Sequence, residues 1–149
     1  MHYHHPYLSD YECFERLMAE YDKHGGLVCA YDFDNSVHDY HKQGHNYIEL
    51  IELIRDAKEI GCYLIVFTAE MDTEKVITFL NENQIPFDTV NENPPFWKST
   101  ARKIYYNILL DDRAGLLSAY TQLKWVVDKV KARRAKELEE QNKKEILTQ

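Results

Sequence analysis

Three short apolar runs, each too short for a helix, constrain the fold of this chain more than any other feature. They are Leu27–Tyr31, Cys62–Phe67 and Ile104–Leu110, and polar side chains follow each of them. Runs of this length between turn residues are typical of buried strands. Segments with apolar residues at every third or fourth position separate the runs, as in amphipathic helices. This alternation predicts an α/β fold with a central, mostly parallel sheet covered on both faces.

The remaining elements follow from periodicity and from capping residues. Ser9 is a suitable N-cap with Glu12 at capping-box spacing, so a helix is expected from Ser9 to about Lys23. The first apolar run is expected to continue as a strand to Asp32. The other expected elements are helices from Tyr47 to about Gly61, from Asp72 to Asn83 and from Ala114 onward, a strand at Phe87–Val90, and a loop at Asn91–Thr100.

Length and composition indicate one globular domain. With 149 residues, 44% of them hydrophobic, the chain can bury a core without disulfides or metals. We expect a single domain over residues 1–130, with its core motifs within 27–117, and a charged helical tail over 131–149. A dimer or partner contact through this tail is the lesser alternative. No apolar stretch approaches the roughly 18 residues of a membrane span, and the three cysteines suit a reduced, cytoplasmic protein.

The charge of the chain is unevenly distributed. The net charge is −7, and residues 129–149 hold seven basic and four acidic side chains. The first 128 residues therefore carry a net charge near −10, from 11 basic and 21 acidic side chains. An acidic body repels a long polyanion, which makes nucleic acid an unlikely partner. A small phosphorylated substrate, whose charge a metal ion offsets, is compatible with it.

Two carboxylates, Asp32 and Asp34, stand at the end of the first expected strand. If the strand continues, its alternation sends both side chains to the same side, with Phe33 facing away. Two anions this close repel each other unless a cation shares the site, and Mg²⁺ is the natural cation for carboxylate oxygens. Aspartate is also common in turns, so the pair alone leaves a solvated turn as the alternative.

The other strand ends carry complementary chemistry. Thr68 follows the second run, and Asp111 and Asp112 follow the third. Because parallel strands end at the same edge of a sheet, these residues are expected to converge on Asp32. The set suits phosphoryl transfer, with Asp32 as nucleophile, Asp34 as general acid and base, and Asp111 and Asp112 completing a Mg²⁺ site. Thr68 can donate its hydroxyl to phosphate, and Lys103, or alternatively Lys98, can supply the opposing cation.

These motifs resemble those of the haloacid dehalogenase-like (HAD) hydrolases. Asp32-Phe33-Asp34-Asn35-Ser36 is similar to the first family motif, and Leu64–Thr68 to the second. Lys103 suits the third motif, and Leu109–Asp112 the fourth. The resemblance implies a three-layer Rossmann-like core, Mg²⁺ and phosphatase activity. It also implies that Asp32 is nucleophile and metal ligand, that Asp34 ligates through its carbonyl group, and that Asp111 or Asp112 ligates the metal.

The chain departs from the family pattern in several places. Ser36 stands where threonine or valine is commoner, Glu70 follows Thr68 closely, and the lysine of the third motif is ambiguous between Lys98 and Lys103. The segment between Asp34 and the next helix leaves room only for a short flap, and Thr68–Lys103 is accounted for by a helix, a strand and a loop. The resemblance is therefore to a capless (C0-type) member with an open site and no large cap domain.

Two further readings compete with the phosphatase. One is a catalytically weak or inactive protein of the same fold that binds a metal or a partner, and a receiver-like phosphate acceptor fits less well. The loop histidines are expected to belong to a plain polar loop, with contact to substrate as an alternative. Zinc binding is a further alternative, although no supporting cysteine or helical histidine pattern accompanies them. Phe96 and Trp97 could stack on a nucleobase or a sugar, or could anchor their loop to the body. The loop histidines are His38, His41 and His45.

Overall fold

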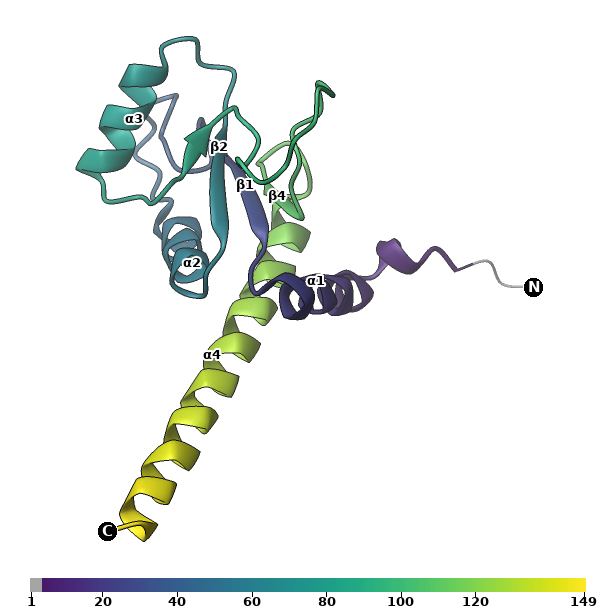
Figure 1. Cartoon of the computed structure of the whole chain (residues 1–149). Helices are drawn as coiled ribbons and strands as arrows, with labels where there is room; N and C mark the ends of the chain where they lie inside the picture. Colours follow the sequence, from purple (N-terminus) through teal and green to yellow (C-terminus); the bar gives the residue numbers. More distant parts are fainter. Residues whose placement is uncertain (1–3) are drawn as a thin grey trace.

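The computed structural model describes residues 4–149, and its elements follow the expected order (Figure 1). A 3-10 turn at Pro6–Leu8 precedes the first helix, and four helices and four strands follow. The helices are α1 (Asp10–His24), α2 (Ile48–Glu59), α3 (Thr73–Glu82) and α4 (Leu116–Leu147). The strands are β1 (Val28–Asp32), β2 (Tyr63–Phe67), β3 (Thr89–Val90) and β4 (Ile108–Leu110).

The four strands form one parallel sheet in the order β3-β2-β1-β4. From β1 the chain adds β2 and then β3 on one side, and it returns to place β4 on the other side of β1. The strand order therefore reverses between β1 and β4. In open parallel sheets, such a reversal opens a crevice at the carboxyl ends of the strands, where ligands bind. The fold is α/β with an entirely parallel sheet, as the sequence predicts.

The helices pack on one face of the sheet. Side chains of all four helices share a core cluster with the strand residues Cys29, Tyr31, Leu64 and Val66. On the opposite face, Val28, Ala30 and Ile65 pack against side chains of the connection between β3 and β4. Within the described residues, no helical side chain belongs to this second cluster. The connection contributes Ile104, Tyr105 and Tyr106 to it.

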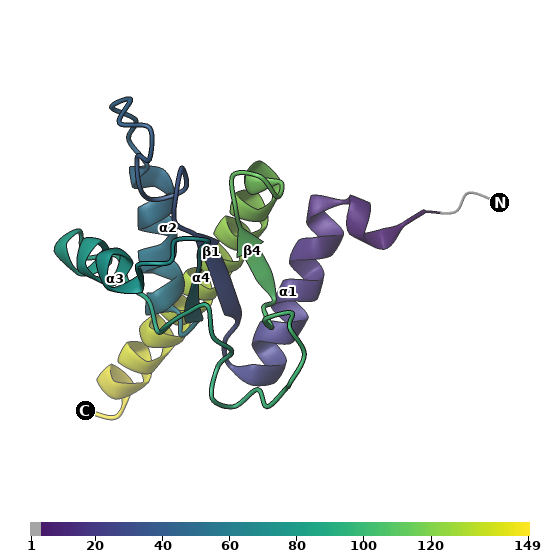
Figure 2. The same cartoon turned by 90° about the horizontal axis from the view of Figure 1, so that it is seen from above.

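The second face of the sheet is covered by an irregular segment, whereas the three-layer core implied by the motifs would place helices there. The connection 91–107 runs along the side of β1 away from α2 (Figure 2). It holds neither a helix nor a strand. Pro94 and Pro95 explain the absence of a helix, since proline lacks the amide hydrogen and clashes with the preceding turn. The sheet therefore has helices on one face and an irregular segment on the other.

Strand β4 is shorter than predicted, because residues 104–107 do not join the ladder. The Asn93 side chain instead accepts the Tyr105 backbone N–H at 2.7 Å. Asn107 bonds the start of β1 twice, since its side chain accepts the Val28 N–H at 2.7 Å and its own N–H donates to the Val28 carbonyl at 2.8 Å. The prediction of a strand over Ile104–Leu110 is thus wrong for its first four residues.

Cys13, Cys29 and Cys62 are buried and unpaired. Among the helices of residues 4–149, none combines the length and the apolarity that crossing a bilayer requires.

The C-terminal tail continues α4 as one helix, which projects beyond the body of the protein (Figure 1). Val130 is its last buried side chain. The next turn still contacts the body: Lys131 pairs with Asp56 at 2.7 Å, and Arg134 donates to the carbonyl of Ile60 at 3.3 Å. The Arg134 bond satisfies the Ile60 carbonyl at the end of α2, and both side chains bring positive charge to this helix end, where it is favoured. Beyond this turn the side chains are exposed.

Two C-terminal deletions test this description. Removing residues 137–149 is expected to leave the free energy of unfolding within about 0.5 kcal/mol of the parent, because only exposed side chains are lost. Removing residues 131–149 also deletes Lys131 and Arg134, and it is expected to cost about 1–2 kcal/mol. Urea denaturation followed by circular dichroism measures both. Equal stability of the two truncated proteins would contradict the assigned contacts.

Candidate metal centre

Three carboxylates converge at the carboxyl ends of β1 and β4. Asp32 is the last residue of β1, and Asp111 and Asp112 follow β4 directly. The register that pairs Tyr31 with Leu110 brings them together, and oxygens of all three side chains lie within 4.8 Å of one another. This cluster, named here the acid cluster, lies at the reversal of strand order. The predicted convergence of Asp32 with Asp111 and Asp112 is therefore present.

A tight turn after β1 holds Asp32 in place. The Phe33 carbonyl accepts N–H bonds from Val37 at 3.1 Å and from His38 at 3.0 Å, and Asn35 adopts a positive φ of 60° within the turn. Asparagine tolerates this conformation better than most residues. The turn buries Ser36 completely, and its hydroxyl donates to Asp32 Oδ2 at 3.2 Å. Ser36 therefore orients the Asp32 carboxylate.

Asp111 is also held by its own turn. Its Oδ1 accepts the Arg113 backbone N–H at 2.8 Å, and its carbonyl accepts the Ala114 N–H at 3.0 Å. Gly115 follows with a positive φ of 70° and begins α4. Asp112, by contrast, is exposed. The two neighbouring acids thus differ in burial and in bonding, although both reach the acid cluster.

Asp34 lies outside the acid cluster. Strand β1 ends at Asp32, so strand alternation does not position the Asp34 side chain. Instead, Asp34 Oδ1 and His38 Nδ1 form a hydrogen bond at 2.9 Å. The His38 ring stacks on Phe33 with a centroid distance of 4.8 Å, and it also contacts Phe79. No sequence pattern indicates this partnership, because the ring contacts arise from the turn after β1 and from Phe79 on α3.

Electrostatic strain is concentrated on Asp32. Burial raises its pKa most, the charge of Asp111 and the Asp112 carboxyl raise it further, and the Phe33 backbone and the Ser36 hydroxyl lower it. The pKa of Asp32 is thereby raised to about 7. Three carboxylates this close suit a hard divalent cation, which would neutralise their repulsion. The donor set of the acid cluster therefore fits Mg²⁺ chemically.

Thr68 lies at the end of β2 in a small hydrogen-bonded bracket. The Asn91 side chain accepts the Thr68 N–H at 2.8 Å and donates to the Thr68 carbonyl at 2.7 Å. The Thr68 hydroxyl accepts the Glu70 N–H at 3.0 Å, so its own hydrogen is available to a ligand. Asn91, which is expected in a loop, joins the end of β2 to the end of β3 through these bonds.

The two candidate lysines are exposed on the 91–107 connection. The Lys103 ammonium lies 5.9 Å from the centroid of the Tyr106 ring. Among the ion pairs of residues 4–149, none joins Lys98 or Lys103 to an acid of the cluster. The sequence predicts that Lys103 lies directly before the strand. Because β4 begins at Ile108, four residues separate Lys103 from it.

The loop histidines do not assemble a metal site. In the described part of the chain, the acid cluster is the one group of three or more metal-ligating side chains that lie close together. His38 bonds Asp34, and His45 bonds the side chain of Gln43 at 3.0 Å. Asp39 organises the loop by accepting three backbone N–H bonds, the shortest from Gly44 at 2.7 Å. The loop is therefore held by a carboxylate.

Tyr47, at the end of this loop, is a neighbour of the acid cluster that the sequence did not single out. Partial burial and the charges of Asp39 and Asp112 raise the pKa of its phenol.

Comparison with protein-family models, with curated proteins and with solved structures finds no significant match for this chain. The function therefore has to be argued from the site itself.

The raised pKa of Asp32 makes stability depend on pH in the absence of divalent ions. Because the pKa of Asp32 is higher in the folded than in the unfolded protein, folding is accompanied by proton binding at Asp32. The stability that this proton contributes is fully present below about pH 4 and is lost as the pH rises through about 7. Asp32→Asn removes this effect. Under EDTA, we expect the variant to gain about 1–2 kcal/mol over the parent between pH 4 and 8, measured by denaturant unfolding. A constant difference across that range would contradict the assigned repulsion.

Proposed function

We propose that this protein is a Mg²⁺-dependent phosphomonoester phosphatase of the capless haloacid dehalogenase-like type, acting on a small phosphorylated substrate. The observation that carries the proposal is the acid cluster at the reversal of strand order, where carboxylates from two segments far apart in the sequence meet. The order of the four motifs along the chain agrees with it. In a three-layer core, the 91–107 segment would have to act as the third layer, on the face of the sheet opposite the helices.

Asp32, Asp111 and Asp112 would hold the cation with their carboxylates, and the Asp34 backbone carbonyl would join them. Bound Mg²⁺ would neutralise the charge of the phosphate and orient it for attack. Ser36 keeps the Asp32 carboxylate in one orientation through its buried hydroxyl. Thr68 has a hydroxyl hydrogen available for a phosphate oxygen.

The reaction would proceed in two displacements. A carboxylate oxygen of Asp32 attacks phosphorus, the bond from phosphorus to the ester oxygen breaks with its electron pair on that oxygen, and Asp34 donates a proton to it. Water then attacks the phosphoryl group, Asp34 takes up a proton from the water, and the bond to Asp32 breaks to release inorganic phosphate. His38 positions Asp34 through its bond at 2.9 Å.

A second candidate is a metal- or partner-binding module of the same fold without turnover. It is favoured by the exposed positions of Lys98 and Lys103, neither of which pairs with the acid cluster. A phosphate site without a fixed cation would bind its substrate weakly. Under this alternative, Mg²⁺ raises the melting temperature of the parent but not of Asp32→Asn, and a broad panel of phosphate esters gives no hydrolysis.

Asp32→Asn tests the nucleophile. The parent is expected to hydrolyse an aryl phosphate in the presence of Mg²⁺ and to lose the activity with EDTA. The variant is expected to lose at least about 10³-fold in kcat, since the amide cannot form the phosphoenzyme. Steady-state release of phosphate measures both.

Asp128→Asn serves as the matched control, because Asp128 is an exposed acid on α4 that pairs with Lys124 outside the site. It should retain parental kcat and KM. Activity of Asp32→Asn within tenfold of the parent would remove the nucleophile assignment.

Asp34→Asn tests the proton transfer. Since a general acid matters most for a poor leaving group, kcat for an alkyl phosphate is expected to fall about 10²–10⁴-fold, and that for a nitrophenyl phosphate much less. The dependence of rate on leaving-group pKa, measured over a series of aryl and alkyl esters, should steepen in the variant. Equal losses for all esters would assign Asp34 a purely structural role.

A further inference from the structure

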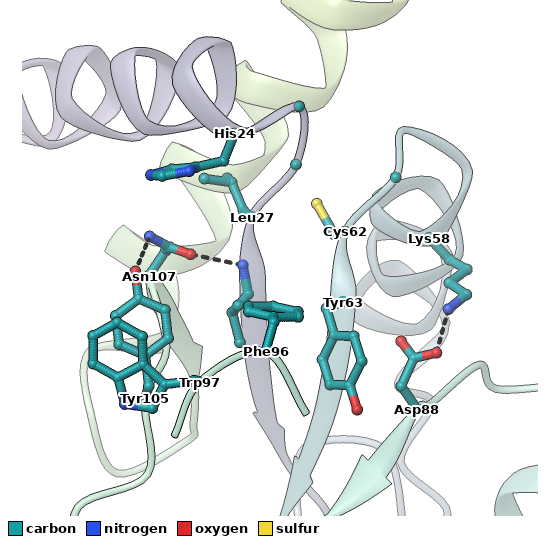
Figure 3. A pocket seen from close by; sticks show the side chains of 14 residues that line it. His24, Leu27, Lys58, Cys62, Tyr63, Asp88, Phe96, Trp97, Tyr105 and Asn107 are labelled. Atoms are coloured by element: carbon teal, nitrogen blue, oxygen red, sulfur yellow. Dashed lines mark hydrogen bonds and ion pairs between the residues drawn. The ribbon is translucent and has the colours of Figure 1, made fainter. Parts of the chain in front are cut away.

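A cavity of about 580 Å³ lies at the amino-terminal ends of the strands, opposite the ends that carry the acid cluster (Figure 3). Its lining includes the segments that precede β1 and β2, whereas the acid cluster follows the ends of β1 and β4. None of the acids of the cluster lines this cavity. It is therefore separate from the proposed phosphatase site, and a ligand could bind there whether or not the protein is a phosphatase.

Two glycine turns form one side of this cavity. Strand β1 begins at Val28, two residues after Gly26, and β2 begins at Tyr63, two residues after Gly61. A side chain at Gly26 would meet the Gly61 carbonyl oxygen at 2.5 Å, so glycine allows the two backbone turns to approach. The remaining wall is the 91–107 connection, which has no regular structure. Long irregular connections in a compact domain are uncommon and are often functional.

Aromatic rings make up much of the wall. Phe96 and Trp97 lie on the connection and are 67% and 44% exposed. The Phe96 ring packs edge to face against the Tyr63 ring, with 5.7 Å between the ring centroids. The Trp97 ring stacks on the Tyr105 ring, with 4.1 Å between the centroids (Figure 3). Exposing large rings beside a cavity leaves their apolar surface available, and such surfaces favour planar ligands.

The polar groups of the lining are fixed and electrically balanced. Apart from His24, its charged side chains are Lys58 and Asp88, which pair at 2.6 Å. Asp88 also accepts the Leu64 N–H at 2.7 Å. Asn107 is held at the wall by its bonds to Val28 and to the Tyr105 hydroxyl (Figure 3). A preformed lining of this kind lowers the ordering cost of binding.

We propose that this cavity binds an uncharged planar heteroaromatic molecule the size of a nucleobase or nucleoside. The volume lies within the range of small-molecule sites. The rings of Phe96, Trp97 and Tyr63 supply stacking and edge contacts, while His24 and the Lys58–Asp88 pair offer hydrogen bonds to ring nitrogens and exocyclic groups. Because the pair neutralises itself, the lining favours an occupant without net charge.

Two tryptophans of similar exposure provide the test. Trp97 lines the cavity, whereas Trp125, 39% exposed, lies on α4 against Phe14. The Trp125→Phe protein, which reports on Trp97 alone, is titrated with nicotinamide, adenine and adenosine, with ribose as a non-aromatic control. We expect saturable quenching by at least one heteroaromatic with a dissociation constant below about 1 mM, and none by ribose. The same titration of Trp97→Phe should show no saturable quenching.

Phe96→Ala tests the wall itself. Loss of this ring is expected to weaken binding about tenfold, as judged in the Trp125→Phe background. Tyr11→Ala removes an aromatic ring of similar exposure, 59%, from outside the cavity and should leave binding unchanged. Equal thermal midpoints of the variants, measured by circular dichroism, exclude loss of folding as the cause.

Five results would overturn the proposal. They are the absence of saturable quenching by all three heteroaromatics, equal quenching of Trp97 and Trp125, and equal binding by Phe96→Ala and its parent. The fourth is self-association that buries Trp97, seen as concentration-dependent fluorescence and a doubled mass in light scattering, since a second copy would then be the occupant. Adenosine monophosphate that binds tenfold more tightly than adenosine would refute an uncharged occupant.

Discussion

The parallel pairing of β1 with both β2 and β4 is the constraint on which the rest of the structure depends. Because β2 and β3 extend the sheet in one direction and β4 in the other, the carboxyl ends of β1 and β4 lie side by side. Helices α1, α2, α3 and α4 bury the same face of the sheet and hold this arrangement. Acids from distant segments can then meet without any direct bond between their turns.

The carboxylates of the acid cluster repel one another, and the surrounding structure holds them close together despite this repulsion. Desolvation and the neighbouring carboxylates raise the pKa of Asp32, while Ser36 and the turn after Phe33 prevent the side chain from moving away. A site held in an unfavourable arrangement by its surroundings is typical of functional centres. A divalent cation would convert the repulsion into binding energy, and this link joins the geometry to the proposed chemistry.

The sheet also divides the molecule into two unlike faces and two unlike edges. One face has the helices, and the other has the irregular 91–107 connection, whose rings leave a cavity at the amino-terminal edge. The carboxyl edge presents charge, whereas the amino-terminal edge presents aromatic surface. The two proposed ligands, a phosphate ester with its metal and an uncharged heteroaromatic molecule, follow from this difference in chemistry.

The sequence by itself determined the order of helices and strands, the parallel sheet, and the convergence of Asp32 with Asp111 and Asp112. These depend on local periodicity and on the rule that parallel strands end at one edge, both of which are readable from residue spacing. Only the tertiary structure decided where β4 begins, that Asp34 bonds His38, and that Lys98 and Lys103 form no ion pair with the acid cluster. Those outcomes depend on side chains far apart in the chain, such as Asn93, Asn107 and Phe79, whose contacts no local pattern encodes. The irregular cover of the second face is an intermediate case, because Pro94 and Pro95 predicted a loop but not where it would lie.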